Sequence, residues 1–218
     1  MKILVCDDHA LFREGVVHAL RELERGAEVV EAADGAEALL LAQQHADLDL
    51  VLLDLHMPGT DGWTGLARLQ QACPTLPIVI LSASEEPADA RRAIEAGAAG
   101  FVPKSTRGPV LRAALSLVLS GGIYLPPHVL VQVAAAAPDG VPPPNAQRRR
   151  GAESLTERQL EVLRLMSRGL TNAEIGEVLG VALGTVKTHI GAIFEALDVS
   201  NRTEAALVMR HLGLDQES

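Results

Sequence analysis

Short apolar runs recur along the first half of the chain, and stretches with helical spacing of their apolar residues lie between them. The runs are KILVCD at 2–7, AEVVEAA at 27–33, LDLVLLD at 48–54, LPIVILS at 76–82 and AAGFVP at 98–103. Strands that alternate with amphipathic helices form parallel sheets, because parallel strands need crossover connections. The pattern therefore predicts an α/β domain over 1–120, with a doubly wound five-stranded parallel sheet.

Proline marks the end of this pattern. The segment 126–150 reads PPHVLVQVAAAAPDGVPPPNAQRRR. Proline has no backbone N–H and excludes regular helix, so the segment is typical of a semi-rigid or disordered connector. We therefore predict a linker rich in Pro, Ala and Arg over 121–151 and a second domain over 152–218.

The second domain has a purely helical pattern with clear start and stop signals. Thr156 with Gln159 and Thr171 with Glu174 each match a capping box, while Gly169 and Gly180 suit the left-handed residue that follows a helix. The signals predict four helices, at 157–168, 172–179, 183–197 and 202–212. The tight turn between the second and third predicts a helix-turn-helix in a small all-α domain.

Charge is unevenly spread along the chain. The formal net charge is -9: residues 1–120 carry 10 Lys/Arg and 17 Asp/Glu, residues 121–151 carry 3 and 1, and residues 152–218 carry 6 and 10. An acidic balance in both halves argues against generic affinity for nucleic acid, although it allows a small basic patch on one face. Aromatic residues make up 2% of the chain, which disfavours single-stranded nucleic acid as a target.

Targeting and metal motifs give few signals. The N-terminus reaches Asp7 too early to form a signal-peptide core, and no apolar run approaches the roughly 20 residues of a membrane span. These features predict a cytoplasmic protein with no membrane partner. Cys6 and Cys73 have no metal-binding spacing and are expected to be packing thiols. The seven histidines form no zinc motif.

Chemically active residues stand where the predicted strands stop. Asp7 and Asp8 end the first strand, Asp54 ends the third, Ser82 ends the fourth, and Lys104 follows the fifth. Ligands of open α/β sheets bind beyond the carboxyl ends of the strands. A single aspartate such as Asp8 is commonly a helix cap, but three carboxylates at one edge repel each other unless a hard cation neutralises them. This set predicts Mg²⁺ as a cofactor.

With these residues in place, the first half resembles the flavodoxin-like receiver domain of two-component response regulators. The segment DLHMPGTDGW at 54–63 is similar to the family's phospho-acceptor segment. The resemblance implies that Asp54 accepts a phosphoryl group from a sensor histidine kinase. It also implies that Asp7, Asp8, Asp54 and the backbone carbonyl of His56 bind the Mg²⁺ ion. Phosphate binding and the conformational switch are then expected to involve Ser82, Phe101 and Lys104.

Two interpretations of this site stay open. His56 either alters how long the phosphate survives or is an exposed loop imidazole. An aspartate-nucleophile phosphohydrolase would also place an aspartate after an apolar strand. Such enzymes carry a second acid two residues later, where this chain has His56, and that class leaves the C-terminal helices unexplained. We therefore expect a phospho-accepting regulator that is no enzyme beyond its own phosphorylation and dephosphorylation.

The second half resembles the LuxR-type DNA-binding domain, and the whole chain is similar to response regulators of the NarL/FixJ type. The matching positions are Glu157, Leu163, Gly169, Asn172, Glu174, Ile175, Leu179, Thr185, Val186, Lys187, His189 and Leu197. The resemblance implies a transcription regulator that binds double-stranded DNA and forms a homodimer on activation.

The helix predicted at 183–197 combines a core face with a sparse outer face. Val186, Ile190, Ile193 and Leu197 form an apolar stripe that is expected to face the core. Recognition helices present their N-terminal residues to the major groove, so Lys187 and Thr188 are expected at base edges. The full set of expected DNA contacts is Lys187, Thr188, Thr185, Gly191, Asn172 and Arg202.

Departures from the family pattern indicate weak DNA affinity. Ala182 replaces a capping serine, Ala173 and Ala196 replace lysines, and Glu195 would repel phosphate. Arg158, Arg168, Arg202 and the cluster 148–150 are candidates to compensate. A dimer would place two such helices on successive half-sites. The alternative is that the helical domain has drifted and binds a protein instead of DNA.

Overall fold

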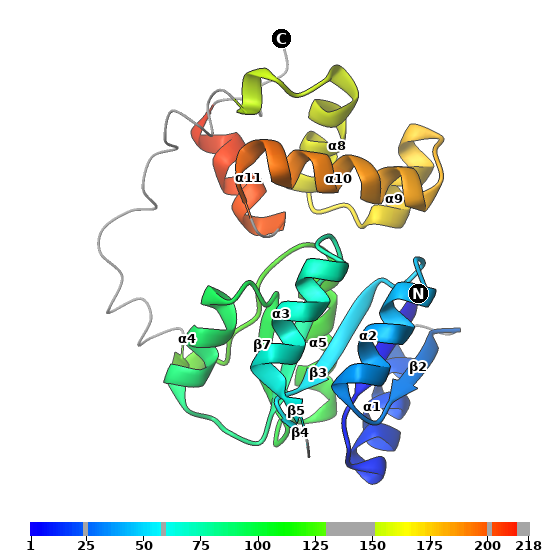
Figure 1. Cartoon of the computed structure of the whole chain (residues 1–218), viewed down its shortest axis with the longest axis vertical. Coiled ribbons are helices and arrows are strands. Elements are labelled where there is room, and N and C mark those ends of the chain that lie inside the picture. The colour runs from blue at the N-terminus through cyan, green and yellow to red at the C-terminus, as the bar shows by residue number, and fades with distance from the viewer. Residues whose placement is uncertain (24–25, 58–59, 130–150, 200–201, 213–218) are drawn as a thin grey trace. The chain divides into compact units, whose positions relative to one another are not determined.

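The computed structural model describes residues 1–23, 26–57, 60–129, 151–199 and 202–212 (Figure 1). The chain divides into two compact units. The N-terminal unit is built on residues 1–119, and the C-terminal unit contains the helices that follow residue 151. Most of the predicted linker, residues 130–150, lies outside the described residues, and so does the arginine cluster 148–150. The domain limits there stay predictions.

The N-terminal unit contains the predicted parallel sheet. Its strands are β1 (Lys2–Cys6), β2 (Glu28–Ala32), β3 (Leu50–Asp54), β6 (Ile78–Ser82) and β7 (Gly100–Pro103), in the order β2-β1-β3-β6-β7. All neighbouring pairs are parallel. The chain reverses its direction of travel across the sheet at β1 and β3, and this switch point brings the ends of those two strands together.

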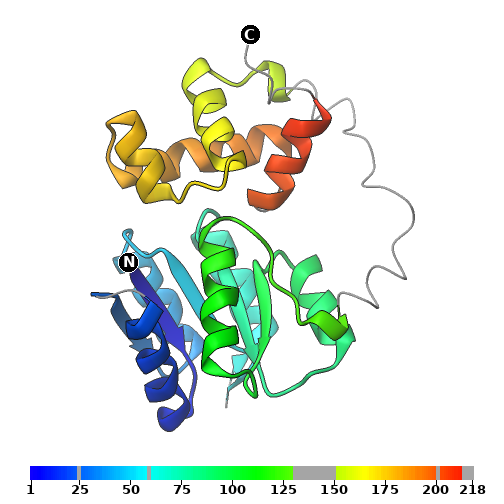
Figure 2. The ribbon, with the colours of Figure 1, turned by 180° about the vertical axis from the view of Figure 1, so that it is seen from behind.

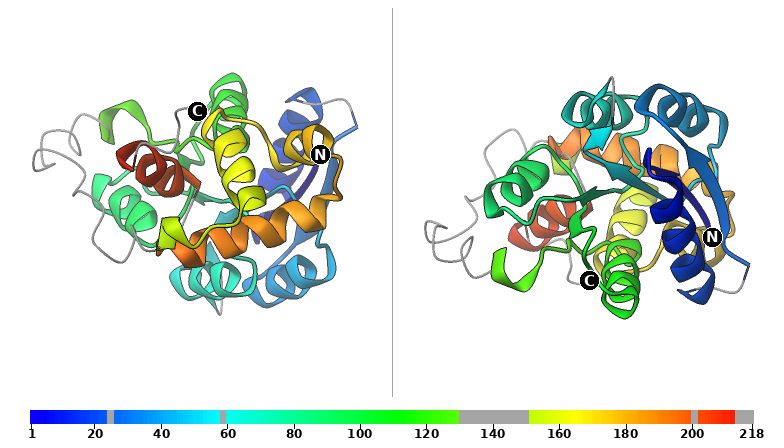
Figure 3. Two further views of the ribbon diagram at one scale, coloured as in Figure 1. Left: turned by 90° about the horizontal axis from the view of Figure 1, so that it is seen from above. Right: turned by 90° about the horizontal axis from the view of Figure 1, so that it is seen from below.

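Helices cover both faces of this sheet (Figures 1 and 2). One face packs against α1 (Ala10–Leu23) and α5 (Gly108–Leu119), and the other packs against α2 (Gly35–Gln44), α3 (Gly62–Ala72) and α4 (Pro87–Glu95). Figure 3, in its right-hand view, shows the sheet between the two sets. Every residue of β3 and β6 is buried, which explains why these strands are continuous apolar runs.

Two features of the N-terminal unit differ from the prediction. A small antiparallel pair, β4 (His56–Met57) with β5 (Thr60–Asp61), follows β3 directly and was not predicted. The ordered packing also continues past residue 120, where the linker was expected to begin. The Phe101 N–H donates to the Tyr124 carbonyl at 2.9 Å, and Val129 is fully buried in the core of this unit.

The described residues of the C-terminal unit include the four predicted helices, with limits that agree with the prediction to within a residue. They are α8 (Glu157–Ser167), α9 (Asn172–Leu179), α10 (Leu183–Leu197) and α11 (Arg202–His211). Both predicted capping boxes are present, and Gly169 and Gly180 have φ of 87° and 64°, in the left-handed region. Sequence alone therefore located these helix ends, because caps and C-terminal glycines act within one turn.

The core of the C-terminal unit is the predicted apolar stripe of α10. Val186, Ile190, Ile193 and Leu197 are all at most 2% exposed and pack against buried residues of α8 and α11. Figure 3 shows α8 crossing α10 in its left-hand view. Within the part of the chain that the structure describes, no single helix is long and apolar enough to cross a membrane. Only α9 and α10 together reach that length, and they are bent by 108°.

Candidate functional site

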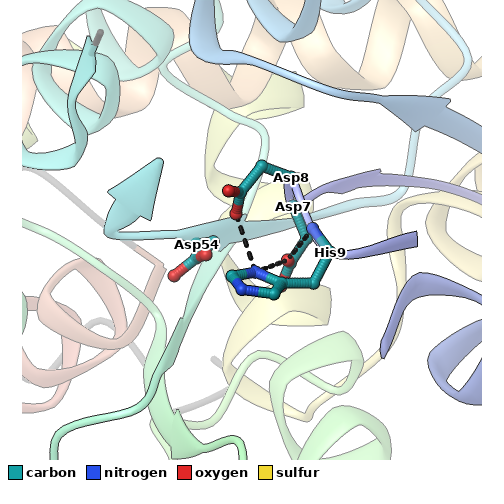
Figure 4. A group of neighbouring side chains, drawn as sticks. All are labelled: Asp7, Asp8, His9 and Asp54. Atoms are coloured by element: carbon teal, nitrogen blue, oxygen red, sulfur yellow. Dashed lines mark hydrogen bonds and ion pairs between the residues drawn. The ribbon is translucent and has the colours of Figure 1, made fainter. Parts of the chain in front are cut away.

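Three carboxylates meet at the switch point of the N-terminal sheet. Asp7 and Asp8 follow β1, and Asp54 ends β3, the neighbouring strand. Asp7 and Asp54 are fully buried, and the Asp8 side chain is 25% exposed. Together with His9, they offer ligand atoms that all lie within 4.8 Å of one another (Figure 4). We call Asp7, Asp8 and Asp54 the acid pocket.

Lys104 joins two of these acids. Its Nζ lies 2.7 Å from Oδ2 of Asp54 and 2.7 Å from Oδ2 of Asp7. Burial by itself lowers the pKa of Lys104, but hydrogen bonds and attraction from Asp54 and Asp7 outweigh burial and raise the pKa above its ordinary value. The Phe12 ring lies 4.9 Å from the same ammonium, in cation–π contact. Lys104 is therefore held as a cation beside the predicted acceptor.

Within the described part of the chain, the Asp54 carboxylate has one hydrogen-bond donor besides Lys104. Its Oδ1 accepts the His56 N–H at 3.0 Å. The His56 side chain is exposed. This position agrees with an exposed imidazole and leaves its influence on a phosphoryl group untested. The predicted use of the His56 carbonyl as a metal ligand also stays a prediction.

The remaining residues of the predicted switch are buried. Ser82 ends β6, is fully buried, and its Oγ accepts the Ser84 N–H at 3.1 Å. Phe101, in β7, is fully buried in the core that faces α2, α3 and α4. The structure therefore brings Asp7, Asp8, Asp54 and Lys104 into contact, while Ser82 and Phe101 lie at neighbouring strands of the same sheet.

Sequence reasoning missed two residues that contact the acid pocket. The His9 ring points at the acids, with Nδ1 2.8 Å from Oδ1 of Asp8 and 3.2 Å from Oδ1 of Asp7 (Figure 4). The Arg13 guanidinium donates to the Asp7 carbonyl at 2.5 Å and to Glu31 at 3.1 Å. Adjacency of His9 to Asp8 was a usable signal for the first, but nothing in the sequence marks the partners of Arg13.

Cys6, at the end of β1, is a packing residue as expected. It is buried and free of any disulfide. Burial, followed by the nearby Asp34, raises the pKa of its thiol to about 12. The thiol is therefore neutral near pH 7 and is not a nucleophile.

The C-terminal unit presents the N-terminal part of α10 to solvent. Gly184, Thr185 and Thr188 are exposed, and Lys187 and Gly191 are partly exposed. The Thr188 hydroxyl donates to the Gly184 carbonyl at 3.0 Å, within the helix. Ala182 is the N-cap residue of α10 and makes no side-chain cap hydrogen bond, as the sequence predicted.

Arg202 and Asn172, both expected at DNA, contact each other inside the unit. The Arg202 guanidinium donates to the Met166 carbonyl at 2.9 Å, to the Leu170 carbonyl, and to Oδ1 of Asn172 at 3.4 Å. Burial, only partly offset by Glu174, lowers the pKa of Arg202 to about 10. These contacts favour a structural role for Arg202, and its predicted DNA contact stays untested.

Arg158 is also held by the protein. It donates to the Leu179 carbonyl at 2.7 Å and pairs with Glu161 at 2.8 Å. Its side chain therefore closes the C-terminal end of α9 and is not a free surface charge.

Comparisons with known proteins match both units. The model of the response regulator receiver domain matches residues 3–116, and the model of the bacterial regulatory proteins of the luxR family matches residues 153–209. The glycerol metabolism activator of Pseudomonas putida is 40% identical over 94% of this chain and 93% of its own length. The nitrate/nitrite response regulator protein NarP of Escherichia coli is 35% identical over 95% of this chain and 93% of its own.

Solved structures agree with these matches. A two-component response regulator of the LuxR family from an Aurantimonas species is 34% identical, with a TM-score of 0.57, and covers 62% of this chain and 96% of that chain. The RcsB response regulator of Salmonella typhimurium covers 96% of this chain and 98% of that chain, with a TM-score of 0.55. Its identity of 24% supports the fold alone.

Proposed function

The chain belongs to the response regulators of the NarL/FixJ type, which join a receiver domain to a LuxR-type DNA-binding domain, and from this membership we propose that Asp54 is its phospho-acceptor and α10 its DNA-reading helix. The family consists of transcriptional regulators and not of classical enzymes. One observation carries the proposal: the buried Asp54 carboxylate lies 2.7 Å from the Lys104 ammonium, at the sheet edge where Asp7 and Asp8 also lie.

The proposed chemistry is transfer of a phosphoryl group from a phosphohistidine of a sensor histidine kinase. An Asp54 oxygen attacks phosphorus, an O–P bond forms, the P–N bond breaks, and the histidine nitrogen takes up a proton. Lys104 balances charge on the transferred oxygens, because its ammonium already lies against Asp54. Positioning and electrostatics supply most of such catalysis, so few catalytic side chains are needed.

The acid pocket fits a hard divalent cation. Oδ2 of Asp7 and Oδ1 of Asp8 are buried without a hydrogen bond, although Lys104 and His9 lie within ion-pair distance of them. These buried carboxylate oxygens, whose described partners are the Lys104 ammonium and the His9 ring, are of the kind that Mg²⁺ prefers as ligands. Asp7, Asp8, Asp54 and the His56 carbonyl would hold the ion, which when bound neutralises charge on the incoming phosphoryl group.

We propose Ser82 and Phe101 as the switch that reads the phosphoryl group. The Ser82 hydroxyl, which now accepts only the Ser84 N–H among the described hydrogen bonds, moves towards the new phosphoryl oxygens. The Phe101 ring then fills the space that the hydroxyl leaves, and the surface formed by α4 and β7 changes. This change favours a homodimer.

The DNA contacts are proposed for the exposed start of α10. Lys187, together with Thr185 or Thr188, is placed at the base edges. Gly191 has no side chain and therefore lets the α10 backbone come close to the DNA groove. A homodimer carries two copies of α10 to two half-sites, which compensates for few basic residues. Nothing in the comparisons favours the alternatives of a protein-binding helical domain or a phosphohydrolase. We also propose a cytoplasmic location, because the protein has to reach both the phosphorylated domain of the kinase and the DNA.

The test combines mass and DNA selection. Incubation with phosphoramidate and Mg²⁺ is expected to add one phosphoryl group to the wild type and none to Asp54→Asn. Genomic fragments are then selected with and without beryllium fluoride, which mimics the phosphoryl group. Enrichment of an inverted repeat only with the mimic supports the proposal. Labelling of Asp54→Asn would refute the acceptor, and absence of enrichment from a protein that binds the mimic would refute the DNA-binding role.

A further inference from the structure

His9 gives the acid pocket a nitrogen ligand. The residue directly follows the two acids of the β1 end, and its side chain is 66% exposed. It nevertheless turns its ring towards the carboxylates and not away from them (Figure 4). The His9 backbone N–H donates to Oδ1 of Asp7 at 2.8 Å, which fixes the backbone directly before α1.

The distances around His9 suit two ligands of one ion. Nδ1 lies 2.8 Å from Oδ1 of Asp8 and 3.2 Å from Oδ1 of Asp7. Two ligands that are each about 2.1 Å from a metal ion, in octahedral or tetrahedral geometry, are about 3.0–3.4 Å apart. The 3.2 Å separation from Asp7 lies in this range and the 2.8 Å separation from Asp8 lies slightly below it, so a small outward shift of the His9 ring would make the imidazole nitrogen and the two carboxylates neighbours in one coordination shell. Asp54 is a further ligand inside the same 4.8 Å group.

Lys104 occupies one side of this group, and His9 occupies the other. The Lys104 ammonium contacts the Oδ2 atoms of Asp7 and Asp54, whereas His9 faces the Oδ1 atoms of Asp7 and Asp8. A cation on the His9 side would use the Oδ1 atoms of Asp7 and Asp8, which Lys104 does not contact among the described ion pairs, although Lys104 pairs with the Oδ2 atom of the same Asp7. Oδ1 of Asp8 is also buried and has no hydrogen bond. The His9 side is thus a donor set of one nitrogen and two carboxylate oxygens, of which Oδ1 of Asp7 already accepts the His9 backbone N–H.

The nature of the donors determines which ions gain from this arrangement. Mg²⁺ prefers oxygen and retains its waters, so an imidazole adds little to its binding. Imidazole suits borderline divalent ions such as Co²⁺, Ni²⁺ and Zn²⁺, whose affinities for nitrogen-containing sites exceed those of harder ions. A pocket made only of carboxylates would show a smaller preference for these ions.

We propose that His9 is a metal ligand of the acid pocket, through Nδ1, and makes the pocket a mixed oxygen and nitrogen site for borderline divalent transition-metal ions. This inference rests on the proposed function, because it concerns the same pocket. Borderline ions then compete with Mg²⁺ at the phosphorylation site, and His9 sets the strength of that competition.

The experiment measures Mg²⁺ and Co²⁺ binding to the full chain by titration calorimetry at neutral pH. His9→Ala is compared with His18→Ala, a matched control that removes an imidazole from the same region; its side chain is 80% exposed. His56→Ala controls for the other imidazole near Asp54. We expect His9→Ala to weaken Co²⁺ binding by about tenfold or more. Losing one residue that supports a metal site typically has an effect of this size. Mg²⁺ affinity is expected to change by less than about threefold.

Proton spectra of the Co²⁺-loaded protein give a second readout. A ligating imidazole shows a strongly shifted, exchangeable ring N–H signal; it is expected in wild type and in both control variants and absent from His9→Ala. His9→Gln provides a second variant should alanine disturb the loop. Lys104→Met is expected to strengthen the binding of Mg²⁺ and of Co²⁺ alike, because it removes a competing positive charge from the same acids.

The outcomes separate the two proposals. Equal Co²⁺ affinity in wild type and His9→Ala, with normal Mg²⁺ binding and phosphorylation, overturns the role of His9 and leaves the proposed function standing. If the shifted signal is lost in His56→Ala and kept in His9→Ala, His56 is the ligand, and this result also overturns the role of His9. A wild-type protein that binds neither ion overturns the cation site of the proposed function and, with it, this inference.

Discussion

Replacing Arg202 by methionine removes a guanidinium whose donors point into the C-terminal unit. Arg202, at the start of α11, bonds the carbonyls of Met166 and Leu170 and the side chain of Asn172. Met166 lies in α8, and Leu170 and Asn172 lie at the turn into α9. One side chain therefore ties three helices together. Methionine keeps the apolar length and supplies no donor.

The magnitude follows from two opposing effects. Two hydrogen bonds from a charged donor to carbonyls contribute about 1.5–3 kcal/mol each. Burial lowers the pKa of Arg202 from its ordinary value to about 10, which corresponds to roughly 3 kcal/mol against the charged form. Allowing for the two carbonyls that lose their donor, we expect Arg202→Met to destabilise the C-terminal unit by about 2 kcal/mol.

Hydrogen exchange measured by mass spectrometry reports this loss for each helix. A loss of about 2 kcal/mol accelerates exchange in α8, α9 and α11 by about 30-fold, whereas peptides of the N-terminal unit serve as an internal reference. Arg158→Met is the matched control, because Arg158 is 36% exposed and bonds one backbone carbonyl, so about 1 kcal/mol or less is expected.

Unchanged exchange in Arg202→Met would refute the reasoning. If that variant also bound DNA more weakly, with a shallower dependence on salt, Arg202 would be a phosphate contact, as the sequence first suggested. Faster exchange with an unaltered salt dependence would instead assign Arg202 to the fold of the domain.

Three further predictions use single substitutions. Ala182→Ser places a capping hydroxyl at the N-cap of α10, where the backbone is already extended, and is expected to stabilise the C-terminal unit by about 1 kcal/mol in urea denaturation; no gain would contradict the cap geometry. Gly62→Ala brings a methyl group into the backbone of Leu55 and is expected to destabilise the N-terminal unit by about 3 kcal/mol or more, seen as a lower thermal midpoint; an unaltered midpoint would refute the overlap. Lys187→Ala is expected to weaken specific DNA binding by about 1–3 kcal/mol in fluorescence anisotropy with the selected repeat, and an equal affinity would exclude Lys187 from the interface.

Several parts of the site followed from local sequence alone. Asp7, Asp8 and Asp54 were expected at one sheet edge, since parallel strands end at the same edge and each acid stands at the end of an apolar run. Lys104 was expected there for the same reason. The structure confirms that these side chains meet. Their chemical roles stay proposals.

Side-chain direction was beyond local reasoning. Lys104 and Asp54 are 50 residues apart, and their pairing depends on β3, β6 and β7 being neighbours in that order. The direction of the His9 ring depends on the positions that the Asp7 and Asp8 carboxylates take in the folded protein. Arg202 was expected at DNA as one of the arginines that could compensate for the missing lysines. Its carbonyl partners, such as Met166 at 36 residues' distance, carry no sequence signal.

The sequence by itself determined the five strands of the parallel sheet, the four helices from α8 to α11, the caps of α8 and α9, the stripe of α10, and the family. Apolar periodicity and capping act over a few neighbouring residues, which is why local sequence is enough for them. Only the tertiary structure decided the strand order, the pair β4 and β5, the packing of Tyr124 beyond the expected domain end, and the inward direction of His9 and Arg202. Those features depend on contacts between distant segments, which form only when the cores close and fix where each polar side chain finds its partner.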